Sequence, residues 1–240
     1  MASFFNLTLD TTAPSGLSFT INDGATYTIS RTVTLTISVT DASTTGYMMR
    51  IWGIDNGSGT TITEQSAQWE AFSATKTVTL PSGDGTKTIY MIVRDAVGNA
   101  MTVQQAVSRS IILDTTVPVV TVTGPDNSVI SATGIITTAA FTFAVTENAE
   151  ASDFIEYKVM LVESENATHD NANNIQIPTT NGSTNMTGTT TADSPFNTNN
   201  TPISCTITGA DLAAAASASG DGVKIIKVFA KDPHGNWSVA

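Results

Sequence analysis

An internal repeat constrains the architecture of this chain more than any other feature of its sequence. Residues 9–14 (LDTTAP) recur as residues 113–118 (LDTTVP), at an offset of 104. Two later motifs, SGDG at 82–85 and DxxGN at 95–99, both recur at an offset of 137. Three matches in the same order indicate two homologous units. Because the offsets differ by 33 residues, the second unit carries an insertion of that length.

The local pattern in both units is that of β-strands. Residues 33–39 alternate between apolar residues and threonine or serine, which is the period of a strand with one buried face. The same alternation occurs at 89–93, 141–145 and 226–230. Asn-Gly and Asp-Gly pairs, which favour tight turns, separate such segments.

We therefore predict an all-β fold of two tandem immunoglobulin-like β-sandwiches. The first covers residues 1–113 and includes an extra N-terminal strand. The second covers residues 114–240 and contains the insertion at about 164–204. One segment departs from the β pattern: residues 210–218 are rich in alanine, and Asp211 is expected to cap a short helical turn there.

The composition excludes several classes of function. The chain has 10 Lys and Arg against 21 Asp and Glu, so a basic surface for nucleic acid is not expected. No segment approaches the roughly 18 apolar residues of a membrane span. One cysteine and two histidines exclude an intrachain disulfide and a zinc cluster. The sequence has no nucleophile elbow, paired-carboxylate motif or phosphate-binding loop, so no enzymatic activity is predicted.

The order of these motifs resembles that of bacterial immunoglobulin-like repeats, which occur in bacterial surface proteins and in phage virion proteins. In the first unit the resemblance covers residues 10–113, including residues 74–80 (ATKTVTL), and in the second it covers only the two ends. It implies the sandwich fold and a role as spacer, stalk or adhesive module. It also implies that Trp69 is buried near the core.

The resemblance and the lack of a secretory signal at the N-terminus predict a non-enzymatic structural protein of a bacteriophage virion, assembled in the host cytoplasm. Such a protein would decorate a capsid, tail or baseplate. Its expected partners are other virion proteins, in a homo-oligomer or a many-copy assembly, and host-surface glycans bound weakly. Nucleic acid and membranes are not expected as partners. The alternative is a bacterial cell-surface adhesin or carbohydrate-binding module.

Three aromatic residues are candidates for contact with a partner or a glycan. Trp52 alternates with Ile51, which favours the outer face of a sheet, and Trp237 follows a turn. Phe196 is the only aromatic residue in the segment 164–204, which holds nine Asn and ten Thr. This polar insertion is interpreted as a surface loop or β-extension, or alternatively as a contact arm for a neighbouring subunit or glycan.

The two DxxGN motifs are interpreted as structural turns, with a cation or ligand loop as the alternative. Their residues are Asp95, Gly98, Asn99, Asp232, Gly235 and Asn236. No cofactor is predicted. Calcium is the alternative, because several acidic residues fall near the expected domain ends. These are Asp10, Asp41, Asp95, Asp114 and Glu147.

The two units differ in the strand that follows the DxxGN turn. In the first unit a final strand is expected at residues 106–113, and the second unit has no equivalent segment. Phe5, Leu7 and Leu9 alternate just before the first LDTT motif, where the final strand of a preceding unit would lie. One hypothesis is that this strand completes the second unit of another copy. The alternatives are pairing within its own domain, or a chain that is a fragment of a longer protein.

Overall fold

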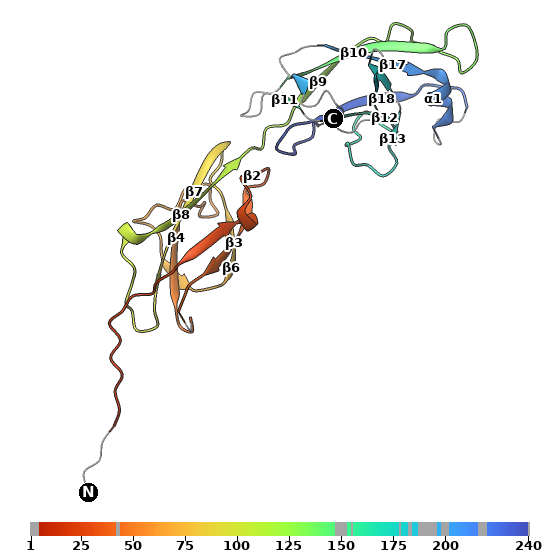
Figure 1. Cartoon of the computed structure of the whole chain (residues 1–240). Helices are drawn as coiled ribbons and strands as arrows, with labels where there is room; N and C mark the ends of the chain where they lie inside the picture. Colours follow the sequence, from red (N-terminus) through yellow and green to blue (C-terminus); the bar gives the residue numbers. More distant parts are fainter. Residues whose placement is uncertain are drawn as a thin grey trace. The chain divides into compact units, whose positions relative to one another are not determined.

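The computed structural model describes residues 5–41, 44–146, 153–154, 156–177, 179–181, 184–186, 196–197, 202–215 and 220–239. The chain divides into two compact units, Met1–Asp114 and Thr115–Ala240, one residue from the expected boundary (Figure 1). Strands make up nearly all of the described elements, which confirms the all-β prediction. No helix among the described residues is long and apolar enough to cross a membrane.

The first unit is a sandwich of two sheets. The smaller sheet has the order β1-β3-β6, and the larger has the order β2-β8-β7-β4-β5. Their bounds are β1 Ser18–Ile21, β2 Tyr27–Thr28, β3 Thr32–Ser38, β4 Met48–Trp52, β5 Trp69–Ala71, β6 Thr75–Thr79, β7 Gly85–Arg94 and β8 Val107–Leu113. Two 3-10 turns, η1 Asn22–Gly24 and η2 Val103–Gln105, lie between strands. All strand pairs are antiparallel except β2 with β8.

The core of the first unit follows the alternation of the sequence. Along strand β3, exposed threonine or serine residues alternate with buried apolar residues. Leu35, at the centre of the strand, is fully buried. From the opposite sheet, Ile89 on β7 and Ile111 and Leu113 on β8 enter the same cluster. The final strand β8 therefore supplies part of the core as well as hydrogen bonds to β7.

The second unit repeats this arrangement with additions. Its larger sheet has the order β15-β14-β17-β10-β9, its smaller sheet the order β13-β12-β18, and β11 pairs with β16. The bounds are β9 Val119–Thr123, β10 Thr138–Thr146, β11 Asp153–Phe154, β12 Glu156–Val162, β13 Ile175–Gln176, β14 Thr179–Asn181, β15 Thr184–Met186, β16 Phe196–Asn197, β17 Ile203–Thr208 and β18 Ile225–Lys231. By topology, β10, β17, β12 and β18 correspond to β3, β6, β4 and β7.

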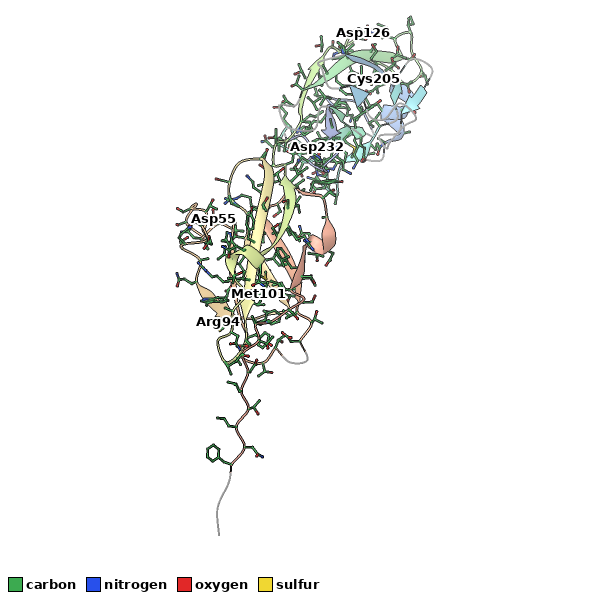
Figure 2. The ribbon with its side chains drawn as sticks, turned by 60° about the vertical axis from the view of Figure 1, so that its left-hand side comes forward. Asp55, Arg94, Met101, Asp126, Cys205 and Asp232 are labelled. Carbon is green, nitrogen blue, oxygen red and sulfur yellow. The ribbon has the colours of Figure 1, made fainter. Side chains whose placement is uncertain are left out.

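Aromatic residues fill the centre of the second unit. The rings of Phe143 on β10 and Tyr157 on β12 have centroids 4.8 Å apart, and both side chains are fully buried. The single cysteine, Cys205 on β17, belongs to the same cluster, with its Sγ 3.9 Å from the Tyr157 hydroxyl (Figure 2). Cys205 is therefore a core residue.

Most of the extra length of the second unit, 29 of the 33 residues, is divided between two connections, so the expected insertion at 164–204 contains only part of it. The connection 163–202 is 18 residues longer than its counterpart 53–74, and the connection 209–224 is 11 residues longer than its counterpart 80–84. The first connection adds the β14–β15 hairpin beside β17, so it is a β-extension. It also contributes Ile177 to the core.

The alanine-rich segment forms one short helix, α1, at Gly209–Ala214. Its cap is Thr208 and not Asp211, because the Thr208 hydroxyl accepts a hydrogen bond from the Asp211 N–H at 3.0 Å. The same hydroxyl donates to the Asp211 carboxylate at 2.6 Å. Asp211 thus lies in the first turn, where a carboxylate is favoured by the helix dipole.

Replacing a central residue of the first core should destabilise that unit strongly. For Leu35→Ala we expect a loss of about 2–5 kcal/mol, because the fully buried side chain leaves a cavity between the two sheets. The measurement is chemical unfolding followed by tryptophan fluorescence. Val97→Ala, at a position 69% exposed, is the matched control and should change the unfolding free energy by less than about 0.5 kcal/mol. Equal effects of the two variants would contradict the assigned core.

Candidate interaction surface

The two DxxGN motifs form the same turn in both units. One carboxylate oxygen of Asp95 accepts hydrogen bonds from the N–H groups of Val97, Gly98 and Asn99 at 3.0, 2.7 and 2.8 Å. Its other oxygen accepts from the Asn99 amide at 2.8 Å. Gly98 has a φ of 103°, which explains the glycine. Every oxygen of this carboxylate thus has a backbone or side-chain partner within the turn.

Asp232, which is labelled in Figure 2, follows β18 and repeats the hydrogen bonding of Asp95. It accepts from the N–H groups of His234, Gly235 and Asn236 at 2.9, 2.6 and 2.8 Å, and from the Asn236 amide at 2.8 Å. Asp232 is fully buried. Because both carboxylates are satisfied from within their own turns, these motifs act in the structure as turns.

The expected calcium ligands gather only in part. The Tyr47 hydroxyl donates to the Asp41 carboxylate at 3.1 Å. Burial raises the pKa of Tyr47, and the bond to Asp41 and the charges of Asp95 and Asp10 raise it further. Glu147 lies outside the described residues. Within the described part of the chain, no group of three or more Asp, Glu, His or Cys side chains has a geometry that could hold a metal.

Trp52 lies on the outer face of its sheet, as the alternation indicates, but it is covered there and is not exposed for contact with a partner. Its ring stacks on that of Tyr90, with centroids 5.6 Å apart, and only 8% of the residue is exposed. Trp69 belongs to the same cluster, on the far side of the sheet from the main core. The Arg94 guanidinium lies 4.8 Å from the Trp69 ring centroid, and the residue Met101 also packs here (Figure 2). The core-proximal position expected for Trp69 is therefore corrected.

Trp237 is half-buried in the second unit and already has three close neighbours. The His169 ring stacks on it with centroids 4.6 Å apart, and the Lys158 and Lys231 ammonium groups lie 4.4 and 5.7 Å from its centroid. Burial lowers the pKa of His169, and the negative charge of Asp170 offsets only part of this decrease. These neighbours come from separate segments of the chain, so no local sequence pattern indicates them.

Phe196 lies in β16, which pairs with β11, and its side chain is outside the described part of the structure. A small recess of about 220 Å³ occurs in the first unit, where Ile51, Glu70 and Lys76 are among the lining residues. This volume is below that of a typical small-molecule site, which is about 300–1,000 Å³. The recess does not favour a ligand pocket.

The N-terminal segment forms no strand with its own unit. Residues 5–9 have no strand pairing and leave the first sandwich as a tail (Figure 1). The chain first contacts the sandwich at Asp10, whose carbonyl accepts a hydrogen bond from the Asn99 amide at 3.3 Å. Phe5, Leu7 and Leu9 are 85%, 85% and 84% exposed. Their alternation thus predicted a strand that the isolated unit does not contain. Residues 1–4, which precede this segment, lie outside the described residues.

As far as the structure describes the chain, one side of β18 in the second unit lacks the strand pairing that the equivalent side of β7 has in the first unit. Strand β18 pairs with β12 along one side, as β7 does with β4. On the other side, Trp237 bridges to Lys231, as Ala100 bridges to Arg94. From residue 222 to residue 228, a range that holds three residues before β18 and the first four of β18, no described residue pairs with this side of the chain. We call residues 222–228 along this side the open edge.

Comparison with known proteins gives distant structural likenesses. No family model matches the chain, and no curated protein matches it. A marsupial T cell receptor is 13% identical with a TM-score of 0.40, covering 93% of this chain and 72% of the receptor chain. Carbohydrate-binding modules of the β-sandwich superfamily give 12% identity and a TM-score of 0.30, covering 96% of this chain and all of the module chain.

A chitinase, ChiA74 from Bacillus thuringiensis, is 14% identical with a TM-score of 0.29. The match covers 92% of this chain, which spans only 30% of the chitinase. At such identities and TM-scores, these likenesses assign neither a family nor a ligand to the chain.

The Asp95 turn should make the first unit sensitive to acid. Burial raises the pKa of Asp95, but the hydrogen bonds from Asn99, Gly98 and Val97 outweigh it and hold the pKa below its usual value. In the unfolded chain the pKa of an aspartate is about 4, so the ionised carboxylate stabilises the folded unit fully above that pH. This stabilisation is lost as the pH falls through the lower pKa that Asp95 has in the folded unit.

We expect Asp95→Asn to lower the melting temperature of the first unit by roughly 4–8 °C at pH 7 and by less at pH 3. Calorimetry between these pH values is the measurement. Asp23→Asn removes the same charge at an exposed position of that unit and should leave the melting temperature unchanged. A pH-independent effect of Asp95→Asn would show that the ionised carboxylate is not what stabilises the turn.

Proposed function

We propose that this chain is a non-catalytic structural protein of a bacteriophage particle that binds other particle proteins through its sheet edges. The observation that carries the proposal is the open edge of the second unit. Unpaired N–H and C=O groups of a sheet edge are the groups that another protein strand binds, and exposed edges are otherwise avoided. Such an edge is therefore a surface suited to a protein partner.

Three further features support a structural role. The carboxylates of the DxxGN motifs are held by their own turns, so they are not available as acids or bases. The only cysteine is in the core. The net charge of −11 favours a soluble outer surface. The resemblance of the motifs to virion and surface repeats gives this role its biological setting.

Mass spectrometry of phage particles, purified from cells that carry the gene, tests the proposal. We expect peptides of this chain in the particles at levels comparable with those of known particle proteins. Treating intact particles with a protease before analysis should remove the chain before the inner proteins. Its absence from the particles and its recovery in the cell envelope would overturn the proposal.

A surface adhesin or carbohydrate-binding module is the second candidate, and Trp237 favours it. A half-buried tryptophan beside the ammonium groups of Lys158 and Lys231 is chemically suited to an acidic sugar. On a glycan array, this candidate predicts binding that Trp237→Ala reduces at least tenfold. Trp69→Ala, which changes a half-buried tryptophan of the other unit, is the control and should not reduce binding. The structural role predicts weak retention that neither variant changes.

A further inference from the structure

We propose that residues 5–9 of one copy of the chain add to the open edge of a second copy, as the final strand of its second unit. This inference rests on the proposed structural function and names the partner of the open edge. β-strand addition of this kind uses backbone hydrogen bonds for affinity and alternate side chains for specificity. The described residues of the first unit include this strand, and those of the second unit do not.

The first unit shows what the final strand does. β8 pairs with β7 in an antiparallel register that places Leu113 opposite Gly85 and Ile111 opposite Lys87. Ile111 and Leu113 are 1% and 0% exposed and belong to the main core. Ile89 on β7 is fully buried in the same cluster. The final strand thus supplies two core side chains and covers the side of β7.

In the described part of the second unit, the acceptor strand β18 pairs with β12 on one side and with no strand on the other. At the offset of 137, Ile226 on β18 corresponds to Ile89, yet Ile226 is only half-buried at the margin of its cluster. Among the described residues, the core of this unit contains no counterpart of Ile111 and Leu113. The open edge therefore combines unpaired backbone groups with an incompletely covered apolar residue.

The N-terminal segment has the side chains that this edge lacks. At the offset of 104, Leu9 and Leu7 correspond to Leu113 and Ile111, because the same LDTT motif follows both strands. Leu7 and Leu9 are more than 80% exposed and have no strand partner in their own unit. Figure 2 shows the side chains of this tail standing clear of the first sandwich. Residues 5–9 contain no proline and no charge, so every position can enter a sheet.

The junction sequence identifies a second copy as the source of the strand. β8 completes the first unit and then leads, through Asp114 and the following residues 115–118, into the next unit of the same chain. Residues 5–9 lead through the matching residues 10–14 into a first unit. When residues 5–9 of one copy complete the second unit of another copy, that second unit is followed by the first unit of the copy that supplied the strand. The strand and the motif at this junction match those between the two units of one chain. The contact is heterologous, so it builds chains or rings of copies.

The register of β8 on β7 predicts the register of the added strand. Transferred to the second unit, it places Phe5 opposite Ile226, Asn6 opposite Ile225 and Leu7 opposite Lys224. Directly opposite residues of an antiparallel pair point to the same face. Phe5 would then cover Ile226, and Asn6 would lie on the outer face.

Light scattering coupled to size-exclusion chromatography of the full chain tests the association. We expect the average mass to rise with concentration to at least twice the 25.0 kDa of one chain. Leu7→Asp with Leu9→Asp should hold the mass at one chain at every concentration. Asn6→Asp with Thr8→Asp adds the same charge to the outer face and should retain association. A wild-type chain that stays monomeric, or equal loss in both double variants, would overturn the proposal.

Cysteine cross-linking tests the partner and the register. Two single variants, Asn6→Cys and Ile225→Cys, are mixed and oxidised; the native Cys205 is buried in both. We expect a disulfide dimer in the mixture and not in either variant alone. If Lys227→Cys is used instead of Ile225→Cys, the second cysteine lies two residues out of register, and the yield of the disulfide dimer should fall at least fivefold. If a disulfide forms only when both cysteines are in one chain, the strand binds its own second unit and the proposal is wrong.

These outcomes separate the inference from the proposed function. A chain present in phage particles that neither associates nor cross-links would refute strand addition between copies and leave the structural role intact. A chain that cross-links in register but is absent from particles would refute the phage role and leave strand addition intact.

Discussion

The structure depends on how a β-sandwich closes the side of its penultimate strand. In the first unit, β8 satisfies the backbone of β7 and contributes Ile111 and Leu113 to the core. In the second unit, the described residues leave the corresponding side of the chain unpaired from residue 222 to residue 228, a range that includes the first four residues of β18. An exposed edge is a surface to which other strands can pair, and the proposed interaction between copies rests on this difference.

The remaining features of the fold are internal supports for the strands. The carboxylates of Asp95 and Asp232 hold equivalent turns after β7 and β18, each with three backbone N–H groups on one oxygen. The hydrogen bonds inside each turn fix where the chain leaves the penultimate strand. The turn is therefore formed in both units, whether or not a final strand follows it.

Much of this fold could be predicted from the sequence, because its signals are local. The alternation at residues 33–39 and the paired DxxGN motifs depend on neighbouring residues, and the strands and turns lie where they indicate. Positions that depend on distant contacts could not be predicted in this way. Trp52, for example, is covered by Tyr90 across a strand pair. The cap of α1 is a local feature, but Thr208 and Asp211 are both residues that cap helices, so the sequence does not decide between them. The exposed Leu7 and Leu9 were recognisable only as a strand without a known partner.

Amide hydrogen exchange, measured by mass spectrometry at low and high protein concentration, tests the central claim most directly. The account predicts that residues 5–9 and residues 222–228 exchange rapidly in dilute protein and become protected together as the concentration rises. In the Leu7→Asp, Leu9→Asp variant, both segments should remain rapid at every concentration. Exchange at residues 222–228 that is slow in dilute protein, or that does not change with concentration, would contradict the account.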